Sequence, residues 1–465
     1  MGSCISGKSN KRDSSQTLPL KPQKYLKFLD NSGILTNSYS MIKKIGEGAT
    51  CQVKLATCKN TKIQRAVKSI SISNEKLRIK AEREIEILKK IDHPCLVRSI
   101  ESFKDPNNIH IVSEFYTGLS LYDMLKEGSG LNEKEALKYM FYIISGLNYL
   151  HKLGIMHRDL KPENMIFESV DSESLLKIID FGSAQYLKKK VYKKKCGTIL
   201  YMSPQVLEGK YTEKCDIWSI GIIFYIMISG THPFYSDTEQ DLLDKIRHLP
   251  IQFKSQKWAN VSSETKHLIS SMLAKKENER LSLENVRKAL NYSLNIRDSE
   301  VINAYSTTIA FNTRSELHRS IVNVGLIKIV GSENVGKMFL HLDADGDGVV
   351  KVQDFLGSDP AKLKESSKSF REFEGDHLTF TEFLISFNDW SEIFGGNMLK
   401  SIFDVIDEDN DGMIAYGDLE KYSTRIHLLK NEMFKGEKQN GSVIKYEEFE
   451  SAFHGFQGNL IIGLS

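Results

Sequence analysis

The sequence lacks any long hydrophobic run. The longest, Ile220–Ile228, has nine residues and contains Gly221. A helix that crosses a bilayer needs about 20 predominantly apolar residues, so this run is too short to span a membrane. No secretory signal peptide is recognisable either.

Cysteine is scarce, and positive and negative charges nearly balance. The six cysteines show no metal-ligand spacing, which favours a reduced intracellular protein. A net charge of +3 is too small to indicate nucleic-acid binding, so we expect no nucleic-acid partner. Hydrophobic content of 40% and charged content of 26% are ordinary for a soluble globular protein, and 465 residues predict two or more domains. The cysteines are Cys4, Cys51, Cys58, Cys95, Cys196 and Cys215.

The most informative stretch is the string His-Arg-Asp-Leu-Lys-Pro-Glu-Asn at residues 157–164. The tripeptide Asp-Phe-Gly follows at 180–182, at the end of the apolar run Leu175–Ile179. Phosphoryl transfer from ATP needs a carboxylate to orient the attacking hydroxyl and a cation to neutralise the moving phosphoryl group. Asp159 and Lys161 provide them. Asn164 and Asp180 are the predicted magnesium ligands.

These motifs resemble the eukaryotic protein kinase family. The resemblance implies that His157 packs and hydrogen-bonds the loop while Asp159 does the chemistry. It also implies that Thr198 touches Asp159 and Lys161, which marks an enzyme directed at serine and threonine. The implied ATP-binding residues are Ile45, Gly46, Glu47, Gly48, Val53, Ala66, Lys68, Glu114, Tyr116, Glu163, Asn164 and Asp180.

Residues 45–53 read as a strand, a turn and a strand over the nucleotide phosphates. Gly46 and Gly48 let backbone amides approach closely. The family pattern has a third glycine where this chain has Cys51. A lone pair of glycines is weak evidence, and its position in the chain supports the interpretation.

Lys68, on the next strand, is expected to contact the α- and β-phosphates. The helical stretch Glu75–Ile91 offers Glu84 as its partner, at the spacing of the family motif. Glu82 and Glu86 lie on the same helix and are expected to be solvated charges.

A strand at Ile109–Ser113 leads into Glu114-Phe115-Tyr116, the expected hinge facing adenine. Ser113 stands at the gatekeeper position, so the pocket behind adenine should be roomy. Ser120 stands where many kinases that prefer basic substrates carry glutamate. Glu163 is therefore the expected contact for a substrate arginine.

The activation segment, Ser183–Ile199, contains no serine or threonine between Ser183 and Thr198. Arg158 in the family normally pairs with a phosphate on this segment, so activation is expected not to depend on a phosphoserine or phosphothreonine there. The segment carries six lysines, which indicate either a solvated loop or a docking surface. The lysines are Lys188, Lys189, Lys190, Lys193, Lys194 and Lys195.

Gln205 departs from the family pattern, which has a glutamate paired with an arginine matching Arg280. Glutamine can still bond Arg280, but the ion pair is lost, so the expected consequence concerns the stability of the large lobe. Residues 216–221 and helices up to about Tyr292 are expected to complete that lobe.

Two later segments have the pattern of an EF-hand calcium loop. Each has aspartates at positions 1, 3, 5 and 12, a glycine at 6 and an apolar residue at 8. The backbone of position 7 supplies a further oxygen. The predicted ligands are Asp343, Asp345, Asp347, Val349 and Asp354, and Asp407, Asp409, Asp411, Met413 and Asp418.

Two weaker copies accompany these loops, one around Leu378 and one around Ile444. Their first positions would be Arg371 and Glu437, so they are expected to pair with a working hand and to hold calcium poorly. The sequence predicts four hands in two lobes, with one good ion site in each.

A basic segment, Asn312–Val330, lies between the kinase motifs and the hands. Leu317, Ile321 and Val324 recur at helical spacing among basic residues, as in a helix gripped by a calmodulin-like lobe. The alternative is a connecting helix with a core-facing stripe, and Gly325 weakens the helix assignment.

The first six residues fit the N-myristoylation pattern, with Gly2 as the acceptor and Ser6 at the required hydroxyl position. Cys4 is a palmitoylation candidate, and basic residues follow. One myristoyl chain binds membrane only marginally, so stable attachment needs a second acyl chain or a basic cluster. The expected location is the cytoplasmic face of a membrane, with the plasma membrane favoured and a cytosolic fraction. An unmodified tail is the alternative.

The order of these features resembles the calcium-dependent protein kinases. The implied fold is α+β: a two-lobed kinase followed by an all-α calmodulin-like domain of four EF-hands. The implied function is calcium-activated transfer of the ATP γ-phosphate to protein serine and threonine, with ATP, Mg²⁺ and Ca²⁺ bound and a junction segment that inhibits until calcium loads the hands. The alternative is a calcium-regulated pseudokinase scaffold. The expected divisions are 1–38 acylated tail and linker, 39–292 kinase domain, 293–330 junction and 331–465 calcium domain.

Overall fold

The structure is a computed structural model. It describes part of the chain. The described residues are 28–31, 33–48, 50–126, 128–187, 191–193, 197–290, 333–351, 377–381, 383, 400, 403, 406–407, 411–415 and 443–449.

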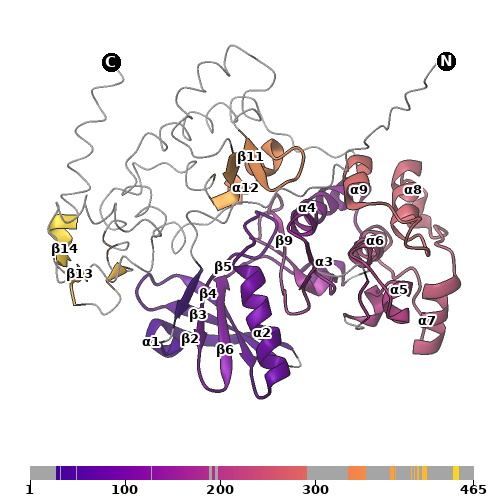
Figure 1. Cartoon of the computed structure of the whole chain (residues 1–465). Helices are drawn as coiled ribbons and strands as arrows, with labels where there is room; N and C mark the ends of the chain where they lie inside the picture. The colour runs from indigo at the N-terminus through magenta and orange to yellow at the C-terminus, as the bar shows by residue number, and fades with distance from the viewer. Residues whose placement is uncertain are drawn as a thin grey trace, which may run out of the picture.

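A six-stranded sheet with one long helix forms the small lobe (Figure 1). The strand order is β1-β5-β6-β4-β3-β2, antiparallel except for the β1–β5 pair. Hairpin-connected antiparallel strands need only short turns, as the sequence provides here. The strands are β1 (Leu29–Asn31), β2 (Tyr39–Gly48), β3 (Cys51–Cys58), β4 (Gln64–Ser71), β5 (Ser99–Lys104) and β6 (Asn108–Glu114).

Strand β4 directs its side chains alternately to the two faces of the sheet. Val67 is fully buried in a small core with Phe103 and Val112. Lys68, the next residue, therefore projects from the opposite face. Helix α2 (Glu75–Leu88) covers that face (Figure 1).

Helix α2 begins at a well-defined cap. The side chain of Asn74 accepts a hydrogen bond from the backbone N–H of Leu77 at 3.0 Å, which satisfies one of the free donors of the first turn. Glu75 in that turn also complements the helix dipole. Three apolar residues and Glu84 make up the buried residues of α2, so the helix carries a carboxylate into the interior between the lobes.

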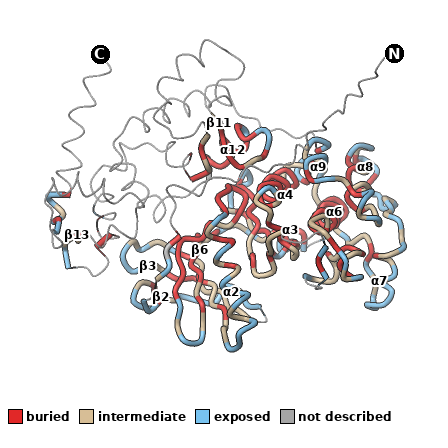
Figure 2. Tube along the Cα trace, viewed as in Figure 1, coloured by how far each residue is buried: buried red, intermediate tan, exposed pale blue. Residues whose placement is uncertain are grey.

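Helices form the large lobe (Figure 1). Two of them are buried along most of their length, α4 (Glu133–Lys152) and α6 (Lys214–Ser229) (Figure 2). Gly230, at φ 71°, ends α6 in a left-handed conformation that glycine adopts without strain. The other helices are α3 (Leu121–Leu125), α5 (Pro204–Glu208), α7 (Glu239–His248), α8 (Ser263–Met272) and α9 (Leu283–Leu290).

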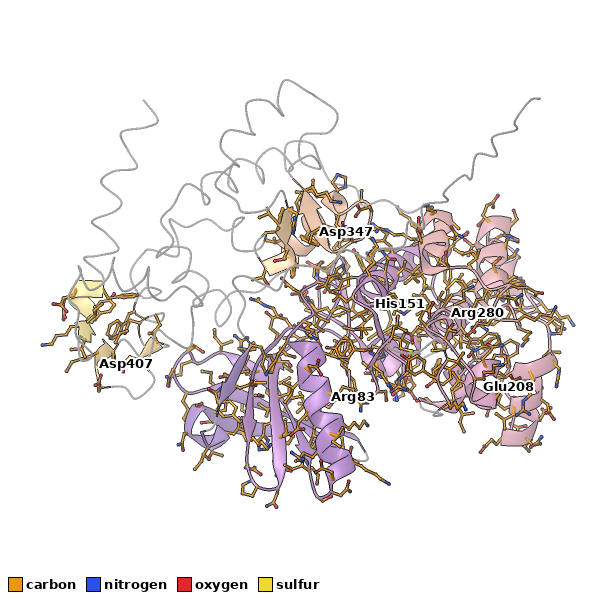
Figure 3. The ribbon with its side chains drawn as sticks, viewed as in Figure 1. Arg83, His151, Glu208, Arg280, Asp347 and Asp407 are labelled. Atoms are coloured by element: carbon orange, nitrogen blue, oxygen red, sulfur yellow. The ribbon has the colours of Figure 1, made fainter. Side chains whose placement is uncertain are left out.

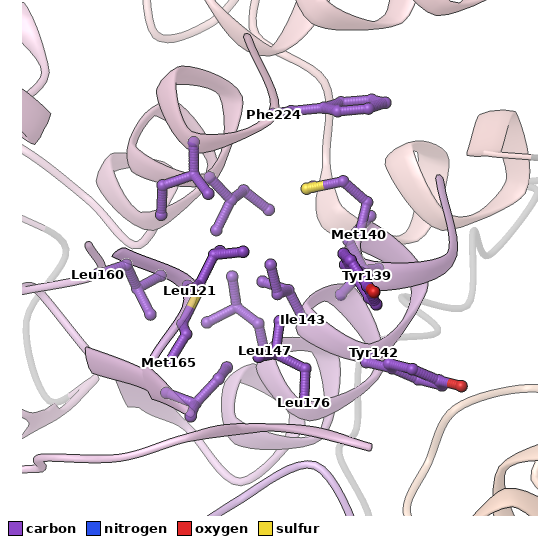
Figure 4. Close-up of a cluster of buried hydrophobic side chains, with 14 of the residues drawn as sticks. Leu121, Tyr139, Met140, Tyr142, Ile143, Leu147, Leu160, Met165, Leu176 and Phe224 are labelled. Atoms are coloured by element: carbon purple, nitrogen blue, oxygen red, sulfur yellow. The ribbon is translucent and has the colours of Figure 1, made fainter. Parts of the chain in front are cut away.

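The core of the large lobe lies between α4, α6 and a two-stranded ribbon beneath the cleft (Figure 4). Ile143 and Leu147 of α4 are fully buried there with Leu160, Met165 and Leu176. Burying one such side chain contributes about 1.5–3 kcal/mol. The loop that carries the catalytic motif is therefore anchored at Leu160 and Met165. The ribbon strands are β8 (Met165–Phe167) and β9 (Leu176–Ile178).

Arg280 is buried in the large lobe, with 1% of its surface exposed, and Gln205 is one of its partners. Arg280 Nη2 donates to Gln205 Oε1 at 2.8 Å, while Gln205 Nε2 donates to the carbonyl of Lys275 at 2.6 Å. Burial lowers the pKa of Arg280 to about 10, although the carboxylate of Glu277 acts to raise it. Glutamine thus keeps the hydrogen bond that the sequence led us to expect.

We expect Gln205→Ala to lower the free energy of unfolding by about 2 kcal/mol, because it leaves a buried guanidinium and a carbonyl short of one partner each. Denaturant titration of the full chain measures this. Gln256→Ala, at an exposed position, is the control and should change stability by less than about 0.5 kcal/mol. Equal effects in the two variants would contradict the assigned role of Gln205.

Two short antiparallel pairs occur in the C-terminal part. They are β11 (Val349–Lys351) with β12 (His377–Thr379), and β13 (Met413–Ala415) with β14 (Val443–Lys445). Val350 pairs with Leu378 and Ile414 with Ile444, so each apolar eighth position lies opposite the equivalent residue of a weaker copy. Helix α12 (Glu333–Leu342) precedes the first pair. Within the described residues, no helix combines the length and apolar character that crossing a membrane requires.

Candidate functional site

Lys68, Glu84 and Asp180 meet in the cleft between the lobes. Lys68 Nζ lies 2.6 Å from Glu84 Oε1 and 2.6 Å from Asp180 Oδ1. Burial acts to lower the pKa of Lys68, but the two carboxylates outweigh it and raise that pKa above its usual value. Burial likewise acts to raise the pKa of Asp180, and Lys68 brings it below its usual range. The cleft therefore holds a charged ammonium and an ionised carboxylate at neutral pH.

A second cluster surrounds Asp159. Asp159 Oδ1 accepts hydrogen bonds from the backbone N–H of Thr198 at 3.1 Å and from its hydroxyl at 3.2 Å. Lys161 Nζ donates to Thr198 Oγ1 at 3.1 Å and lies 3.7 Å from Asp159 Oδ2. Asn164 Nδ2 donates to the carbonyl of Asp159 at 2.8 Å, which orients this loop. Three of the predicted catalytic residues, Asp159, Lys161 and Thr198, are thus brought together.

Asp216, at the start of α6, holds the catalytic loop, which the sequence interpretation did not foresee. Its carboxylate accepts from the backbone N–H of His157 at 2.9 Å and of Arg158 at 2.8 Å, and it lies 2.9 Å from His151 Nε2. Arg158 has φ 69°, a left-handed conformation that is strained for a residue with a side chain. Asp216 offsets that strain and so fixes the direction of Asp159. Figure 3 places His151 within the large lobe.

His157 packs beneath the loop and is fully buried. Burial lowers its pKa despite the nearby carboxylates, so the ring is neutral at pH 7. Nε2 lies 3.3 Å from the carbonyl of Ile179, and the ring lies edge-on to Phe181, with 5.2 Å between centroids. Its contacts are those of a packing residue, and Asp159 remains the better-placed base.

The loop over the cleft contains Gly46 and Gly48 in the β2–β3 hairpin. Gly48 pairs with Cys51, and a Cβ at Gly48 would lie 3.1 Å from Cys51 Sγ. Glu47 is exposed and pairs with Lys44 at 2.5 Å. The hairpin thus accommodates Cys51 at the position where the family pattern has a third glycine. The other predicted ATP-contact residues of this lobe lie on β2, β3 and β4: Ile45, Val53 and Ala66.

The hinge side chains are engaged elsewhere than in the cleft. Glu114 Oε1 accepts from Arg98 Nη1 at 3.0 Å, and both are buried. The hydroxyl of Tyr116 accepts from the backbone N–H of Arg98 at 3.0 Å and lies 3.3 Å from Glu114 Oε2. The hinge is thus left to offer backbone groups to a nucleotide. Ser113 bonds Ser99 through their hydroxyls, 2.9 Å apart.

Two predicted substrate-facing positions differ in their surroundings. Ser120 caps α3, accepting from the backbone N–H of Asp123 at 3.0 Å and donating to its carboxylate at 2.6 Å. Glu163 is exposed and has no hydrogen bond or ion pair with any described residue. Glu163 is therefore the carboxylate available to meet a cation at this edge of the cleft.

The segment 343–351 turns around three carboxylates, and these oxygens lie within 4.8 Å of one another. Asp343 accepts from the backbone N–H groups of Asp347 and Gly348 at 2.9 and 3.1 Å. Burial, together with repulsion from Asp347, raises the pKa of Asp343 to about 8. Lys351 lies 2.8 Å from Asp345 and 3.0 Å from Asp347. Converging carboxylates held by a tight turn fit a divalent cation.

The second acidic segment repeats this turn. Asp407 accepts from the backbone N–H groups of Asp411 and Gly412 at 3.1 and 2.9 Å. Asp411 accepts from the N–H of Met413 at 2.8 Å, as Asp347 does from that of Val349 at 3.0 Å. Figure 3 labels one aspartate of each turn, Asp347 and Asp407, which lie far apart.

The first acidic turn contacts the large lobe, a contact that no sequence pattern indicated. Asn148 and Lys152 of α4 donate to the carbonyls of Gly346 at 2.6 Å and Asp345 at 3.2 Å. Arg287 of α9 donates to the carbonyl of Asp343 at 2.8 Å.

A second contact involves the loop that follows α2. Both the N–H and the hydroxyl of Thr381 donate to the buried carboxylate of Asp92, at 2.9 and 2.7 Å. His93, beside it, packs against Phe339 of α12. Thr381 and helix α12 are thereby joined to the loop that follows α2.

Several predictions fall outside the described residues. They are the acylation sites Gly2 and Cys4, the junction segment 293–330, and the predicted calcium ligands Asp354, Asp409 and Asp418.

The family model described as the protein kinase domain matches residues 39–291. The chain is 33% identical over 426 residues to calcium-dependent protein kinase 3 of Plasmodium berghei (strain Anka), covering 88% of this chain and 76% of that protein. It is 30% identical over 464 residues to calcium-dependent protein kinase 4 of Plasmodium falciparum (isolate 3D7), covering 91% and 87%. Calcium-dependent protein kinase 5 of the same organism is 31% identical over 454 residues, covering 90% and 78%.

Proposed function

The chain belongs to the calcium-dependent protein kinases, a family of serine/threonine protein kinases, and on that basis we propose how its residues carry out catalysis and regulation. The observation that carries the catalytic proposal is the pairing of Lys68 with Glu84 and Asp180 beside the Asp159 cluster. Its test is phosphate transfer to a serine peptide by the parent enzyme and by Asp180→Ala.

Asp159 orients the hydroxyl of the protein substrate, and Lys161 and Thr198 hold that carboxylate in place. Lys68 would bind the ATP phosphates, fixed by the buried Glu84. Asn164 and Asp180 would hold magnesium, which supplies charge neutralisation at the phosphates when bound. Glu163 would receive a basic residue of the substrate.

The pseudokinase alternative has no support. It was motivated by Cys51, Ser120 and Gln205, and none of these departures displaces a catalytic side chain: Cys51 fits the hairpin, Ser120 caps a helix and Gln205 bonds Arg280. Lys68, Glu84, Asp159, Lys161, Asn164 and Asp180 are all present.

Calcium regulation is proposed to act through the acidic turns. Loading of EF-hand loops opens an apolar groove that can take a basic amphipathic helix. The segment 312–330 is the proposed occupant, and without calcium it would keep the kinase inactive. The contacts of Asn148, Lys152 and Arg287 with the first turn give that turn a direct connection to the large lobe.

Membrane attachment is proposed through the N-terminus, at the cytoplasmic face. The support is Gly2, Cys4 and Ser6 together with Lys8, Lys11 and Arg12.

We expect Gly2→Ala to move the protein from the membrane to the soluble fraction of cells, because it removes the acyl acceptor. Cys4→Ser should weaken attachment only in part. Fractionation followed by immunoblotting measures both, and Ser9→Ala is a control that leaves the acylation pattern intact. Unchanged membrane association of Gly2→Ala would place the attachment elsewhere in the chain.

A further inference from the structure

A basic cavity of about 370 Å³ lies between helix α2 and the start of the activation segment, next to the active site. Four cationic side chains line it: Lys76, Lys80 and Arg83 from α2, and Arg158 from the catalytic loop. Gly182 and Ser183, which follow the metal-binding aspartate, close another side. Figure 3 shows Arg83 on α2, in the small lobe, so its shared cavity with Arg158 brings residues of the two lobes together.

These positive charges have no hydrogen-bonded or ion-paired carboxylate within the described part of the chain, although Lys80 lies close enough to Glu84 to favour the ionised form of that carboxylate. Lys76, Lys80 and Arg83 form no hydrogen bond or ion pair there. Arg158 donates to the carbonyl of Ser183 at 2.8 Å and to the hydroxyl of Tyr211 at 3.2 Å, both uncharged acceptors. Like charges gathered around one cavity repel each other, and a bound anion would remove that repulsion.

Arg78, on the same helix, shows the contrasting arrangement. It pairs with Glu75 at 2.6 Å and with Glu82 at 3.2 Å and does not line the cavity. The helix therefore places one cation in ion pairs with two carboxylates and directs three others, which form no ion pair, to the cavity beside Arg158.

The activation segment does not offer a suitable anion. It has no serine or threonine between Ser183 and Thr198. Its two tyrosines are engaged elsewhere: the hydroxyl of buried Tyr192 donates to the carbonyl of Tyr186 at 2.7 Å, and the ring of Tyr186 lies against Lys90, whose Nζ is 4.6 Å from the ring centroid. The anion must therefore come from outside this segment.

We propose that this cavity binds the phosphate of a second, already phosphorylated residue of the protein substrate. A phosphate monoester carries nearly two negative charges and three acceptor oxygens, which suits two arginines and two lysines around one cavity. The kinase then prefers substrates that another kinase has phosphorylated first. This inference rests on the kinase activity of the chain and adds a substrate class to it.

The position of the phosphate on the substrate follows from the geometry. Arg158 and Asp159 are consecutive, so the cavity lies on the order of 10 Å from the hydroxyl that Asp159 orients, given the reach of an arginine side chain. An extended peptide covers about 3.3–3.6 Å per residue. The phosphorylated residue should thus stand roughly three to five positions from the phosphoacceptor.

The test compares matched peptides that carry either phosphoserine or alanine at one position. Each peptide has a single acceptor serine, and the varied position stands three, four or five residues away on either side of that serine. The full-length enzyme is assayed in calcium. For the best-placed phosphoserine we expect KM to fall about 10-fold with little change in kcat, since charge-assisted bonds act on binding. Inorganic phosphate should compete with the phosphorylated peptide and not with the unphosphorylated one.

Three variants locate the effect. Lys80→Ala and Arg83→Ala should each reduce the preference to about 3-fold or less, whereas Arg78→Ala, which removes the same charge from the same helix, should retain it. Activity on the unphosphorylated peptide shows whether each variant is folded and active as a kinase. Loss of that activity would therefore count against the proposed kinase function, whereas loss of the preference alone would reflect the phosphate-binding cavity.

Two results would overturn the proposal. One is an equal KM for phosphorylated and unphosphorylated peptides at all six positions. The other concerns the source of the phosphate: if phosphatase treatment of the enzyme lowers its activity on every peptide, and Lys80→Ala and Arg83→Ala reproduce that loss, the phosphate belongs to the enzyme's own chain.

Discussion

Replacing Asp180 with alanine should abolish phosphate transfer while the protein remains folded. Asp180 bonds Lys68 at 2.6 Å and its pKa is held low, so it is the ionised carboxylate available to a magnesium ion in the cleft. Losing such a ligand removes several kcal/mol of transition-state stabilisation, which corresponds to at least about 1,000-fold in kcat. Radiolabelled transfer to a serine peptide measures the loss.

The matched control is Asp237→Ala, at an exposed position of the large lobe. It should transfer phosphate like the parent. Thermal unfolding of both variants checks the fold. An Asp180→Ala enzyme that keeps more than about a tenth of the parental activity would overturn the assignment of Asp180 as a metal ligand.

Replacing both Asp343 and Asp407 with alanine should make the full-length enzyme unresponsive to calcium. Each is the first carboxylate of its acidic turn and accepts two backbone hydrogen bonds within it. Removing both takes away a charged ligand and loosens each turn. We expect activity in calcium to fall to the level seen in chelator.

The calcium concentration for half-activation of the parent should lie in the weak part of the sensor range, about 10⁻⁷–10⁻⁵ M. Asp354 and Asp418 stand at position 12, where the longer glutamate normally supplies two oxygens. In the first turn, calcium must also displace the ammonium of Lys351 from Asp345 and Asp347.

The single variants Asp343→Ala and Asp407→Ala show which turn contributes more to the calcium response. Asp171→Ala, at an exposed position of the large lobe, is the control and should respond to calcium like the parent. Full calcium stimulation of the double variant would mean that the response arises outside these two turns.

The chemistry of the site could be predicted from the sequence because its residues lie in short motifs with fixed spacing. Lys68 and Glu84 are sixteen residues apart and meet at 2.6 Å. The two-lobed kinase fold is confirmed by the family match and by the sheet and helices of the two lobes. The four-hand calcium domain stays a prediction, although the pairing of Val350 with Leu378 and of Ile414 with Ile444 fits it.

Features made by distant residues could not be predicted in this way. Lys76, Lys80 and Arg83 look like an ordinary solvated helix face in the sequence, and only the fold places Arg158 across a cavity from them. Asp216 lies inside an apolar helix pattern that carries no sign of its bonds to the catalytic loop.

Backbone contacts leave even less trace in a sequence. Asn148 and Arg287 recognise carbonyl groups of the first acidic turn, and carbonyls are common to every residue. The hinge is a similar case, since Glu114 and Tyr116 matched the motif position but direct their side chains to Arg98. A motif fixes which residue is present, whereas tertiary packing decides which of its atoms is available.

The most direct test of calcium-activated phosphate transfer is one assay of the full-length protein on a basic serine peptide, with calcium and with chelator in parallel. The account predicts phosphate transfer that is strong in calcium and close to background in chelator. Equal activity in both conditions would contradict calcium control, and no activity in either would contradict the kinase assignment.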